Sequence, residues 1–294
     1  MQEFEFISAQ TVGEACRALA SEGSRAIAGG TDVIPRLQRN LFPAGTLVDI
    51  SRLAELRFIK ESGEHNRRIA IGALTSYSDM LESELLQQET PALIDAVYTV
   101  GCPQTRYRGT VGGNIVNASP AGDTLPPLLV LDASLLLVRE DGQRTLPLSD
   151  FFLGPGQTAL QQGELLHTVS FPRPPASSGD AFIKLGNRRG MNIAVASAGV
   201  YVELADDGAI AAARVAFGSV APTPRRSPGA EAVLIDQQPS PELFRRAAEA
   251  AQEDISPIGD VRASAAYRRH AAAQILQRAL DKAVAGVARE KATT

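Results

Sequence analysis

Two glycine pairs, each beside a short apolar run, constrain the fold of this chain more than any other feature. The first lies in "AIAGGTDVIPRL" (residues 26–37) and the second in "RGTVGGNIVNASPAGDTLPP" (residues 108–127). Paired glycines permit positive φ angles and a close approach of the backbone, because no Cβ intervenes. Most such pairs form simple turns, but the N–H groups of a glycine-rich loop can also bind phosphate. Two pairs followed by Asn and Asp favour nucleotide binding, although the residues alone leave the simple turn open.

The familiar nucleotide motifs do not match either pair. The first pair lacks the Gly-Lys-Ser/Thr sequence of a P-loop. The segment "GPGQTA" (residues 154–159) approaches the dinucleotide fingerprint, but its glycines flank a proline and no strong helix follows. We expect a loop between strands there, so a bound nucleotide would not be held in the Rossmann manner.

Short strands and helices alternate in the first half of the chain. Thr11 begins a helix with Glu14 three residues later, which is the spacing of a capping box. Strands are predicted on both sides of that helix and again before a turn at Thr75 and Ser76; these strands lie in the segments 4–9, 25–32, 46–51 and 66–72. This alternation indicates an α+β or α/β protein rather than an all-helical one.

The second half begins with strands and ends in helices. A hairpin is predicted at Asp141-Gly142, and "ELLHTVSFP" (residues 164–172) forms a further strand. The Pro- and Ser-rich segment 172–180 is a natural domain boundary. Strand-like runs and then Ala-rich helices follow it. We therefore predict two domains, residues 1–176 and residues 177–294.

Composition excludes several classes of function. The formal net charge is −4 with acids and bases mixed, which differs from the basic surface of a nucleic-acid-binding protein. The two cysteines, Cys16 and Cys102, have no paired spacing, and the three histidines are scattered, so a metal site is not expected. No secretory leader and no apolar run of about 20 residues is present, which predicts a cytoplasmic protein without a membrane span.

Five segments in order resemble one known family. They are "AIAGGTDVIPRL", "GCPQTRYRGTVGGNIVNASPAGDTLPPLLVLDA", "FFLGPGQTALQQGELL", "FIKLGNRRGMNIAVAS" and "DVRASAAYRRHAAAQILQRAL". Their order and character are similar to the FAD-binding medium subunit of molybdenum hydroxylases, the group that includes xanthine dehydrogenase and aerobic carbon monoxide dehydrogenase. The resemblance covers essentially the whole chain.

This resemblance implies an α+β fold. It comprises a vanillyl-alcohol-oxidase-type (PCMH-type) FAD-binding domain of two α+β subdomains, followed by a C-terminal domain of a three-stranded antiparallel sheet with helices. The first glycine segment would bind the FAD pyrophosphate, the second would approach the phosphates and the ribityl chain, and five other positions would surround the flavin or accept hydrogen bonds from it. The implied cofactor-binding residues are Ile27, Ala28, Gly29, Gly30, Thr31, Asp32, Val33, Val100, Gly101, Thr110, Val111, Gly112, Gly113, Asn114, Asp123, Leu166 and Lys184.

By the same resemblance, Lys184 reaches the polar edge of the isoalloxazine. A cation there stabilises the anionic reduced flavin and raises its reduction potential. The alternative is a solvated lysine at the end of a strand. Asp123 would accept hydrogen bonds from the cofactor, or it would cap the helix that follows, or both. Arg106 and Arg108 would pair with phosphate or a partner's carboxylate, although solvated arginines are an equal alternative.

Two positions depart from the family pattern. Tyr107 stands where asparagine is usual, which puts a side-chain contact there in doubt. Asn192 stands where aspartate is common, and the segment lacks the acidic run of NAD-reducing xanthine dehydrogenases, which weakens the case for NAD as the electron acceptor.

The resemblance implies electron relay in a complex. Substrate would be oxidised at a molybdenum cofactor on a large subunit, and electrons would pass through two 2Fe-2S clusters on a small subunit to FAD on this chain, in a heterotrimer that dimerises. The lack of a cysteine set for a cluster fits this division. Two alternatives stay open: a self-sufficient FAD-dependent oxidase or reductase, and a nucleotide-binding module without redox chemistry.

Overall fold

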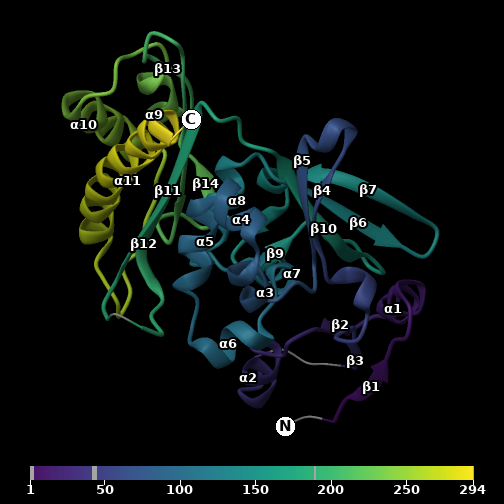
Figure 1. Cartoon of the computed structure of the whole chain (residues 1–294). Helices are drawn as coiled ribbons and strands as arrows, with labels where there is room; N and C mark the ends of the chain where they lie inside the picture. The colour runs from purple at the N-terminus through teal and green to yellow at the C-terminus, as the bar shows by residue number, and fades with distance from the viewer. Residues whose placement is uncertain (1–2, 42–44, 189, 294) are drawn as a thin grey trace.

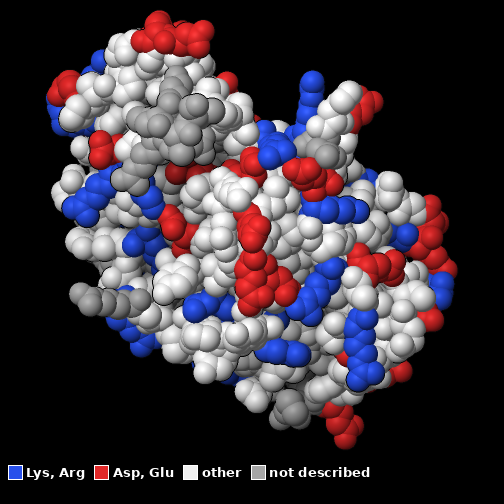
Figure 2. Space-filling view, viewed as in Figure 1, with Lys and Arg blue, Asp and Glu red and all other residues white. Residues whose placement is uncertain are grey.

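The computed structural model describes residues 3–41, 45–188 and 190–293 and divides into three groups of elements (Figure 1). A small parallel sheet lies beside a larger antiparallel sheet, a cluster of short helices occupies the middle, and a second antiparallel sheet backed by long helices lies on the other side (Figure 1). This mixed architecture confirms the predicted α+β fold. Basic and acidic side chains are interspersed over the face in Figure 2.

The first glycine pair follows a strand of the small sheet. Strands β1 (Glu5–Ser8) and β2 (Ser24–Ile27) pair in parallel with the central β3 (Thr46–Asp49). Helix α1 (Val12–Leu19) connects β1 to β2, and the Oγ1 of its N-cap Thr11 accepts a hydrogen bond from the Glu14 N–H. The predicted capping box is only half formed, because the Glu14 carboxylate accepts from the Gln10 N–H rather than from the Thr11 N–H. Helix α2 (Val33–Gln38) follows the glycines.

The larger sheet has five strands in the order β4-β5-β10-β6-β7. Their bounds are β4 Ile59–Ser62, β5 Arg68–Gly72, β6 Ser134–Arg139, β7 Gly142–Pro147 and β10 Leu165–Pro172. The predicted hairpin at Asp141-Gly142 joins β6 to β7. Between β5 and β6 the chain forms six helices: α3 Tyr77–Glu82, α4 Glu84–Glu89, α5 Pro91–Tyr98, α6 Pro103–Arg108, α7 Val111–Asn117 and α8 Leu125–Val130.

The segment "GPGQTA" contributes to a small hairpin. Its strands are β8 (Phe152–Gly154) and β9 (Gln157–Thr158), and Gly156 between them has φ +69°. This arrangement confirms that the segment does not form the strand-to-helix turn of a Rossmann domain. The described residues also include four single turns of 3₁₀-helix, at Ala54–Leu56, Glu64–Asn66, Leu148–Asp150 and Ala251–Glu253.

The C-terminal sheet contains the three long antiparallel strands that the family resemblance implies. They are β11 (Ser178–Gly186), β12 (Ala194–Leu204) and β13 (Ile210–Gly218), and the two-residue β14 (Arg225–Arg226) adds a fourth at the edge. Helices α9 (Pro228–Leu234), α10 (Pro241–Ala250) and α11 (Ala265–Thr293) complete this unit. Helix α11 packs on β11 and β12, and a core of small and branched residues lies between the helices and the sheet.

Close backbone contacts fix the C-terminal sheet against the middle helices. Helices α5 and α8 pack on the same sheet that α11 covers. A Cβ on Gly199 of β12 would lie 2.8 Å from the carbonyl carbon of Pro126 in α8, and one on Gly179 would lie 2.2 Å from the Ala283 carbonyl oxygen. Glycine therefore lets α8 and α11 approach the sheet at backbone distance. No helix of the described residues is long and apolar enough to cross a membrane.

Candidate FAD site

The first glycine segment connects β2 to α2. Ile27 ends the strand, Val33 begins the helix, and Gly30 has φ +72°, a conformation that favours glycine. The backbone N–H groups of residues 29–32 have no backbone or side-chain acceptor among the described residues. Unpaired N–H groups at such a turn are suited to binding an anion.

Gly29 is a glycine for a different reason. A Cβ at this position would lie 1.6 Å from the carbonyl oxygen of Arg108 and 2.4 Å from its carbonyl carbon. The two glycine-containing segments therefore touch through their backbones, and any side chain on Gly29 would separate them. Packing alone accounts for the missing side chain at Gly29.

The second glycine pair lies in a helix rather than in the turn or loop that its sequence predicts. Thr110 is the N-cap of α7, and its Oγ1 accepts from the Gly113 N–H at 3.0 Å. The other N–H groups of this turn donate to Thr75, Ala73 and Thr110 carbonyls. A Cβ on Gly112 would lie 2.6 Å from the Ala73 carbonyl oxygen, whereas one on Gly113 would approach only the Thr110 hydroxyl, at 3.0 Å. Gly113 thus has an open face, whereas the N–H groups of residues 111–114 are already occupied.

A cavity of about 280 Å³ lies where the two segments meet. No carboxylate lines it, and the side chains of Arg52 and Arg108 lie there with no hydrogen bond or ion pair to another described residue. The cavity is therefore electropositive. Its lining residues are Ala28, Gly29, Ser51, Arg52, Leu53, Ala54, Arg57, Leu74, Ser76, Tyr107, Arg108 and Thr110.

Sequence reasoning missed Ser51 and Arg52 in this cavity. They follow strand β3, whose carboxyl end lies beside that of β2 in the parallel sheet. Ligands of parallel sheets gather at that edge, so the topology, once known, was the signal that could have found them. Tyr107, the first departure from the family pattern, is 67% exposed and lines the same cavity.

Lys184 and Asp123 form a buried ion pair. Lys184 Nζ donates to Asp123 Oδ2 at 2.6 Å, and the two side chains are 4% and 10% exposed. The ammonium also donates to the backbone carbonyls of Asn192 at 3.0 Å and Thr99 at 3.4 Å. Lys184 is therefore not the solvated strand-end lysine considered as the alternative.

Asp123 has unused hydrogen-bonding capacity. Its Oδ1 is buried and has no hydrogen-bond partner among the described residues. Burial raises the pKa of Asp123 to about 6, even though the Lys184 ammonium opposes this rise. Burial and then the charge of Asp123 also raise the pKa of the Tyr77 phenol. A buried carboxylate oxygen without a donor is costly, so this atom fits a site where a bound molecule supplies the donor.

The side chain of Asp123 does not cap helix α8, which was the alternative role considered for it. Thr124 is the N-cap of α8 and makes no side-chain capping bond; its hydroxyl donates instead to Asn114 Oδ1 at 2.7 Å. Asn114 is thereby connected to the residue that follows Asp123. The middle of α7 and the N-terminal end of α8 therefore meet beside the ion pair.

The remaining predicted residues occupy defined positions. Gly101 has φ +50° in the turn between α5 and α6, and the carbonyl of Val100 accepts from Arg106 at 3.0 Å. Thr99, just before them, contacts Lys184, so this turn adjoins the ion pair. Leu166 is 3% exposed in the core of the large sheet.

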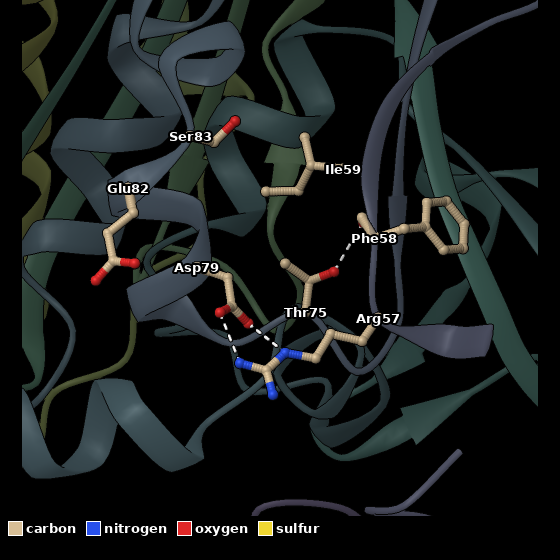
Figure 3. Close-up of a pocket in the computed structure, with 7 residues that line it drawn as sticks. All are labelled: Arg57, Phe58, Ile59, Thr75, Asp79, Glu82 and Ser83. Atoms are coloured by element: carbon tan, nitrogen blue, oxygen red, sulfur yellow. Dashed lines mark hydrogen bonds and ion pairs between the residues drawn. The ribbon is translucent and has the colours of Figure 1, made fainter. Parts of the chain in front are cut away.

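A second cavity of about 370 Å³, between β4 and α3, contains none of the predicted residues (Figure 3). Arg57 donates to both carboxylate oxygens of Asp79, at 2.9 and 2.7 Å, and Thr75 donates to the Phe58 carbonyl. Burial raises the pKa of Asp79, but the hydrogen bonds from Arg57 and Ser76 outweigh this effect and hold that pKa below its ordinary value. The polar groups that line this second cavity are thus largely paired with one another.

The paired segments have the features of a dinucleotide site. Unpaired N–H groups and free arginines suit a pyrophosphate, the open face of Gly113 allows close approach, and the buried Asp123 Oδ1 needs a donor such as a ring N–H or a hydroxyl. These features fit FAD. The fold and the site therefore define a flavoprotein of a non-Rossmann type.

Comparison with known proteins gives the particular family. Residues 2–174 match the FAD binding domain in molybdopterin dehydrogenase, and residues 181–283 match the CO dehydrogenase flavoprotein C-terminal domain. The chain belongs to the family of FAD-binding medium subunits of molybdenum hydroxylases, and its cofactor is FAD. Both the family resemblance and the FAD prediction are confirmed.

The relatives match over nearly their full length. The carbon monoxide dehydrogenase medium chain of Hydrogenophaga pseudoflava is 33% identical over 95% of this chain and 96% of its own. The xanthine dehydrogenase FAD-binding subunit of Escherichia coli O157:H7 is 32% identical over 96% of this chain and 97% of its own. The solved carbon monoxide dehydrogenase of H. pseudoflava has a TM-score of 0.92 at 33% identity and covers 97% of this chain and 98% of its own.

A more distant solved structure shows the same fold. Quinoline 2-oxidoreductase from Pseudomonas putida 86 has a TM-score of 0.90 at 26% identity, covering 97% of this chain and 98% of its own. The chain is thus the FAD-containing part of an oxidoreductase of this family. Its relatives are medium subunits of multi-subunit enzymes.

Proposed function

We propose that this chain receives electrons from an iron–sulfur small subunit and passes them, through FAD, to an external acceptor. The observation that carries the site assignment is the buried Asp123 Oδ1, which lacks a donor while its carboxylate partner oxygen binds Lys184. A ring with N–H donors and developing negative charge would satisfy both groups together. FAD, when bound, supplies the chemistry of accepting electrons singly or in pairs.

The glycine segments would hold the phosphate part of the cofactor. We assign its contacts to Ile27–Val33 through the backbone N–H groups and the Thr31 hydroxyl, and to Thr110–Asn114 through the open face of Gly113 and the Asn114 side chain. Arg52 and Arg108 add positive charge at the adjoining cavity. This division assigns hydrogen bonding to the first segment and close approach to the second.

The groups around the ion pair would hold the flavin. We assign the polar edge of the ring to Lys184 and Asp123, and its apolar surroundings to Val100, Gly101 and Leu166. The Lys184 ammonium donates to three oxygen acceptors, which fix its position in a buried site. A fixed buried cation stabilises negative charge on a reduced ring more than a solvated cation does.

The complex would contain two partner subunits. We propose a large subunit with the molybdenum cofactor and a small subunit with two 2Fe-2S clusters, in a heterotrimer that dimerises, located in the cytoplasm or at the inner face of the membrane. Within the chain, residues 1–176 would form the FAD-binding domain and residues 177–294 the C-terminal domain. The full-length match to medium subunits of multi-subunit enzymes supports this assembly.

Purification from the native source tests the relay. We expect the chain to co-purify with a large and a small subunit and with molybdenum, iron and FAD. A yellow monomer that turns over a substrate unaided would instead support a self-sufficient oxidase or reductase. A colourless chain that stays free of FAD after cofactor supplementation would contradict both and favour a module without redox chemistry.

A further inference from the structure

A buried arginine of the C-terminal unit connects two distant segments. Arg268, near the start of α11, has a side chain only 4% exposed. Its Nη1 donates to the carbonyl oxygens of Val195 at 2.6 Å and Ser219 at 3.1 Å, and its Nη2 donates to Asp260 Oδ1 at 2.7 Å. One guanidinium thus holds two backbone segments and one carboxylate.

The two carbonyls lie where strands β12 and β13 separate. The β12–β13 ladder ends at the pair Ser197–Gly218, and Val195 lies at the bulge where β11 and β12 shift register. Ser219, just beyond the ladder, has φ +64° and turns away from β12. Arg268 supplies donors to both carbonyls at this point, which satisfies backbone groups that the ladder no longer pairs.

Both segments lead directly to the Lys184 site. Asn192, three residues before Val195, presents its carbonyl oxygen to Lys184 Nζ. On the other side, the Ser219 N–H donates to the Pro120 carbonyl at 2.7 Å. Pro120 belongs to the turn closed by the Gly122 N–H and the Ser119 carbonyl, and Asp123 is the next residue.

Stability alone is a poor explanation for this arginine. Its Nε is buried and has no acceptor among the described residues, and Ser219 Oγ nearby is likewise buried without a partner. Burying a charge with incomplete hydrogen bonding costs free energy that an apolar side chain of similar volume would avoid. The arrangement is better explained by what the guanidinium holds in place.

We infer that Arg268 is a positioning residue for Lys184. One guanidinium holds Val195, in the segment that carries the Asn192 carbonyl, and Ser219, whose N–H donates to the Pro120 carbonyl in the turn before Asp123, so that both acceptors keep the ammonium at one point. This role rests on the proposed placement of Lys184 at the flavin. Arg268 itself touches neither Lys184 nor Asp123 and acts only through the backbone.

The test compares four single variants and one double variant of the assembled, FAD-containing complex. Arg268→Met removes the donors and keeps an elongated side chain, and Arg268→Lys restores one cation. The matched control is Arg269→Met, because Arg269 is the next residue of the same helix and also donates to two carbonyls, those of Gln252 and Ile255, away from the site. Lys184→Met measures the full effect of losing the ammonium. The measured quantities are the flavin midpoint potential and the FAD content.

We expect Arg268→Met to lower the flavin potential in the same direction as Lys184→Met and by less, Arg268→Lys to recover part of that shift, and Arg269→Met to leave the potential unchanged. The double variant Arg268→Met/Lys184→Met should shift the potential no further than Lys184→Met alone, because both act on the same interaction.

Other outcomes separate the two proposals. If Lys184→Met lowers the potential but Arg268→Met does not, or if the two shifts add, the positioning role is wrong while the flavin site stands. If Lys184→Met leaves the potential unchanged, the placement of Lys184 at the flavin is wrong. If Arg268→Met cannot be obtained folded, Arg268→Lys must show the intermediate shift, and a wild-type potential in that variant contradicts the role.

Discussion

At the scale of single residues, the site depends on a pair of charges that are expensive to bury separately. Lys184 has three oxygen acceptors, whereas Asp123 has one oxygen paired and one without a donor. The pair is therefore asymmetric: the cation is fully satisfied and the carboxylate is not. This asymmetry leaves the carboxylate available to a ligand and keeps the cation in place whether or not the ligand is bound.

The raised pKa of Asp123 has a consequence for stability. Its pKa rises from 3.8 to about 6 because burial penalises the charged form. The folded protein then holds this proton more tightly than the unfolded chain does. Protonated Asp123 therefore stabilises the folded state fully below about pH 4, and this stabilisation is lost as the pH rises through about 6. The difference between the two pKa values corresponds to about 3 kcal/mol in the free energy of unfolding.

We expect Asp123→Asn to remove this pH dependence. Urea denaturation of wild type and variant at several pH values between about 4 and 7 measures it. The free energy of unfolding of the wild type minus that of Asp123→Asn should fall by up to about 3 kcal/mol as the pH rises across this range. A difference that stays constant with pH would show that Asp123 titrates normally.

The glycines of α7 allow packing and ligand approach to be separated. Gly113→Ala should preserve or raise the free energy of unfolding, by up to about 1 kcal/mol, because alanine favours helix and only the Thr110 hydroxyl lies near the added methyl. It should nevertheless reduce the FAD content of the complex if the open face of Gly113 adjoins the cofactor.

The matched control is Gly112→Ala in the same turn. There the methyl would meet the Ala73 carbonyl oxygen at 2.6 Å, so we expect lower stability as well as lower FAD content. Absorbance of released FAD per chain and thermal unfolding give both quantities. Full FAD content in Gly113→Ala would remove Gly113 from the proposed site.

At the scale of elements, sequence patterns predicted local structure better than they predicted contacts. The strand before the first glycine pair, the hairpin at Asp141-Gly142 and the Thr11 cap follow from periodicity and capping residues. The helical state of the second glycine pair did not follow, because its low helix propensity is overcome by packing on Ala73 and by the Thr110 cap.

The contacts of the site depend on tertiary packing that no local pattern contains. The pairing of Lys184 with Asp123 joins residues 61 positions apart and requires α8 to lie on β12. The backbone contact of Gly29 with Arg108 likewise depends on how two separate units meet. Family resemblance located these residues in the sequence, whereas the structure shows what each one contacts.

The contact between α8 and β12 can be tested at Gly199. Gly199→Val would place its Cβ about 2.8 Å from the Pro126 carbonyl carbon and force the helix away from the sheet. We expect a loss of about 1–3 kcal/mol in the free energy of unfolding. The variant should also lose more FAD than its lower stability alone explains. The reason is that Asp123 precedes α8 by two residues, so a displaced α8 would move Asp123 as well.

Gly286→Ala in α11 is the control for Gly199→Val, because nothing lies within 4 Å of the added methyl. It should keep FAD and raise stability slightly. Chemical denaturation and FAD content measured on both variants decide the question. A Gly199→Val protein with normal stability and FAD would show that α8 does not need this close contact.

At the scale of the whole molecule, the separate units bring together residues that none of them contains alone. The small parallel sheet supplies the unpaired N–H groups, the middle helices supply Gly113 and Asp123, and the C-terminal sheet supplies Lys184. The ion pair of Lys282 on α11 with Asp95 on α5 adds a further bridge between the C-terminal and middle units. The relative position of the units therefore decides whether the proposed site can form.

This dependence predicts how a complex without FAD behaves. Gly30→Val places a branched side chain at a backbone with φ +72°, beside Ile34 Cγ1 at 3.3 Å, so it should distort the first segment and abolish FAD retention while the C-terminal unit stays folded. In the assembled complex, substrate should still reduce the iron–sulfur clusters, whereas reduction of the external acceptor should stop.

Absorbance of the clusters and acceptor reduction, followed in the same sample, separate these two steps. Added FAD should not restore acceptor reduction in Gly30→Val, but it should restore it in wild-type complex stripped of flavin. If the Gly30→Val complex reduces the acceptor at the wild-type rate without bound FAD, electrons leave by another route, and this chain is not the relay between the clusters and the acceptor.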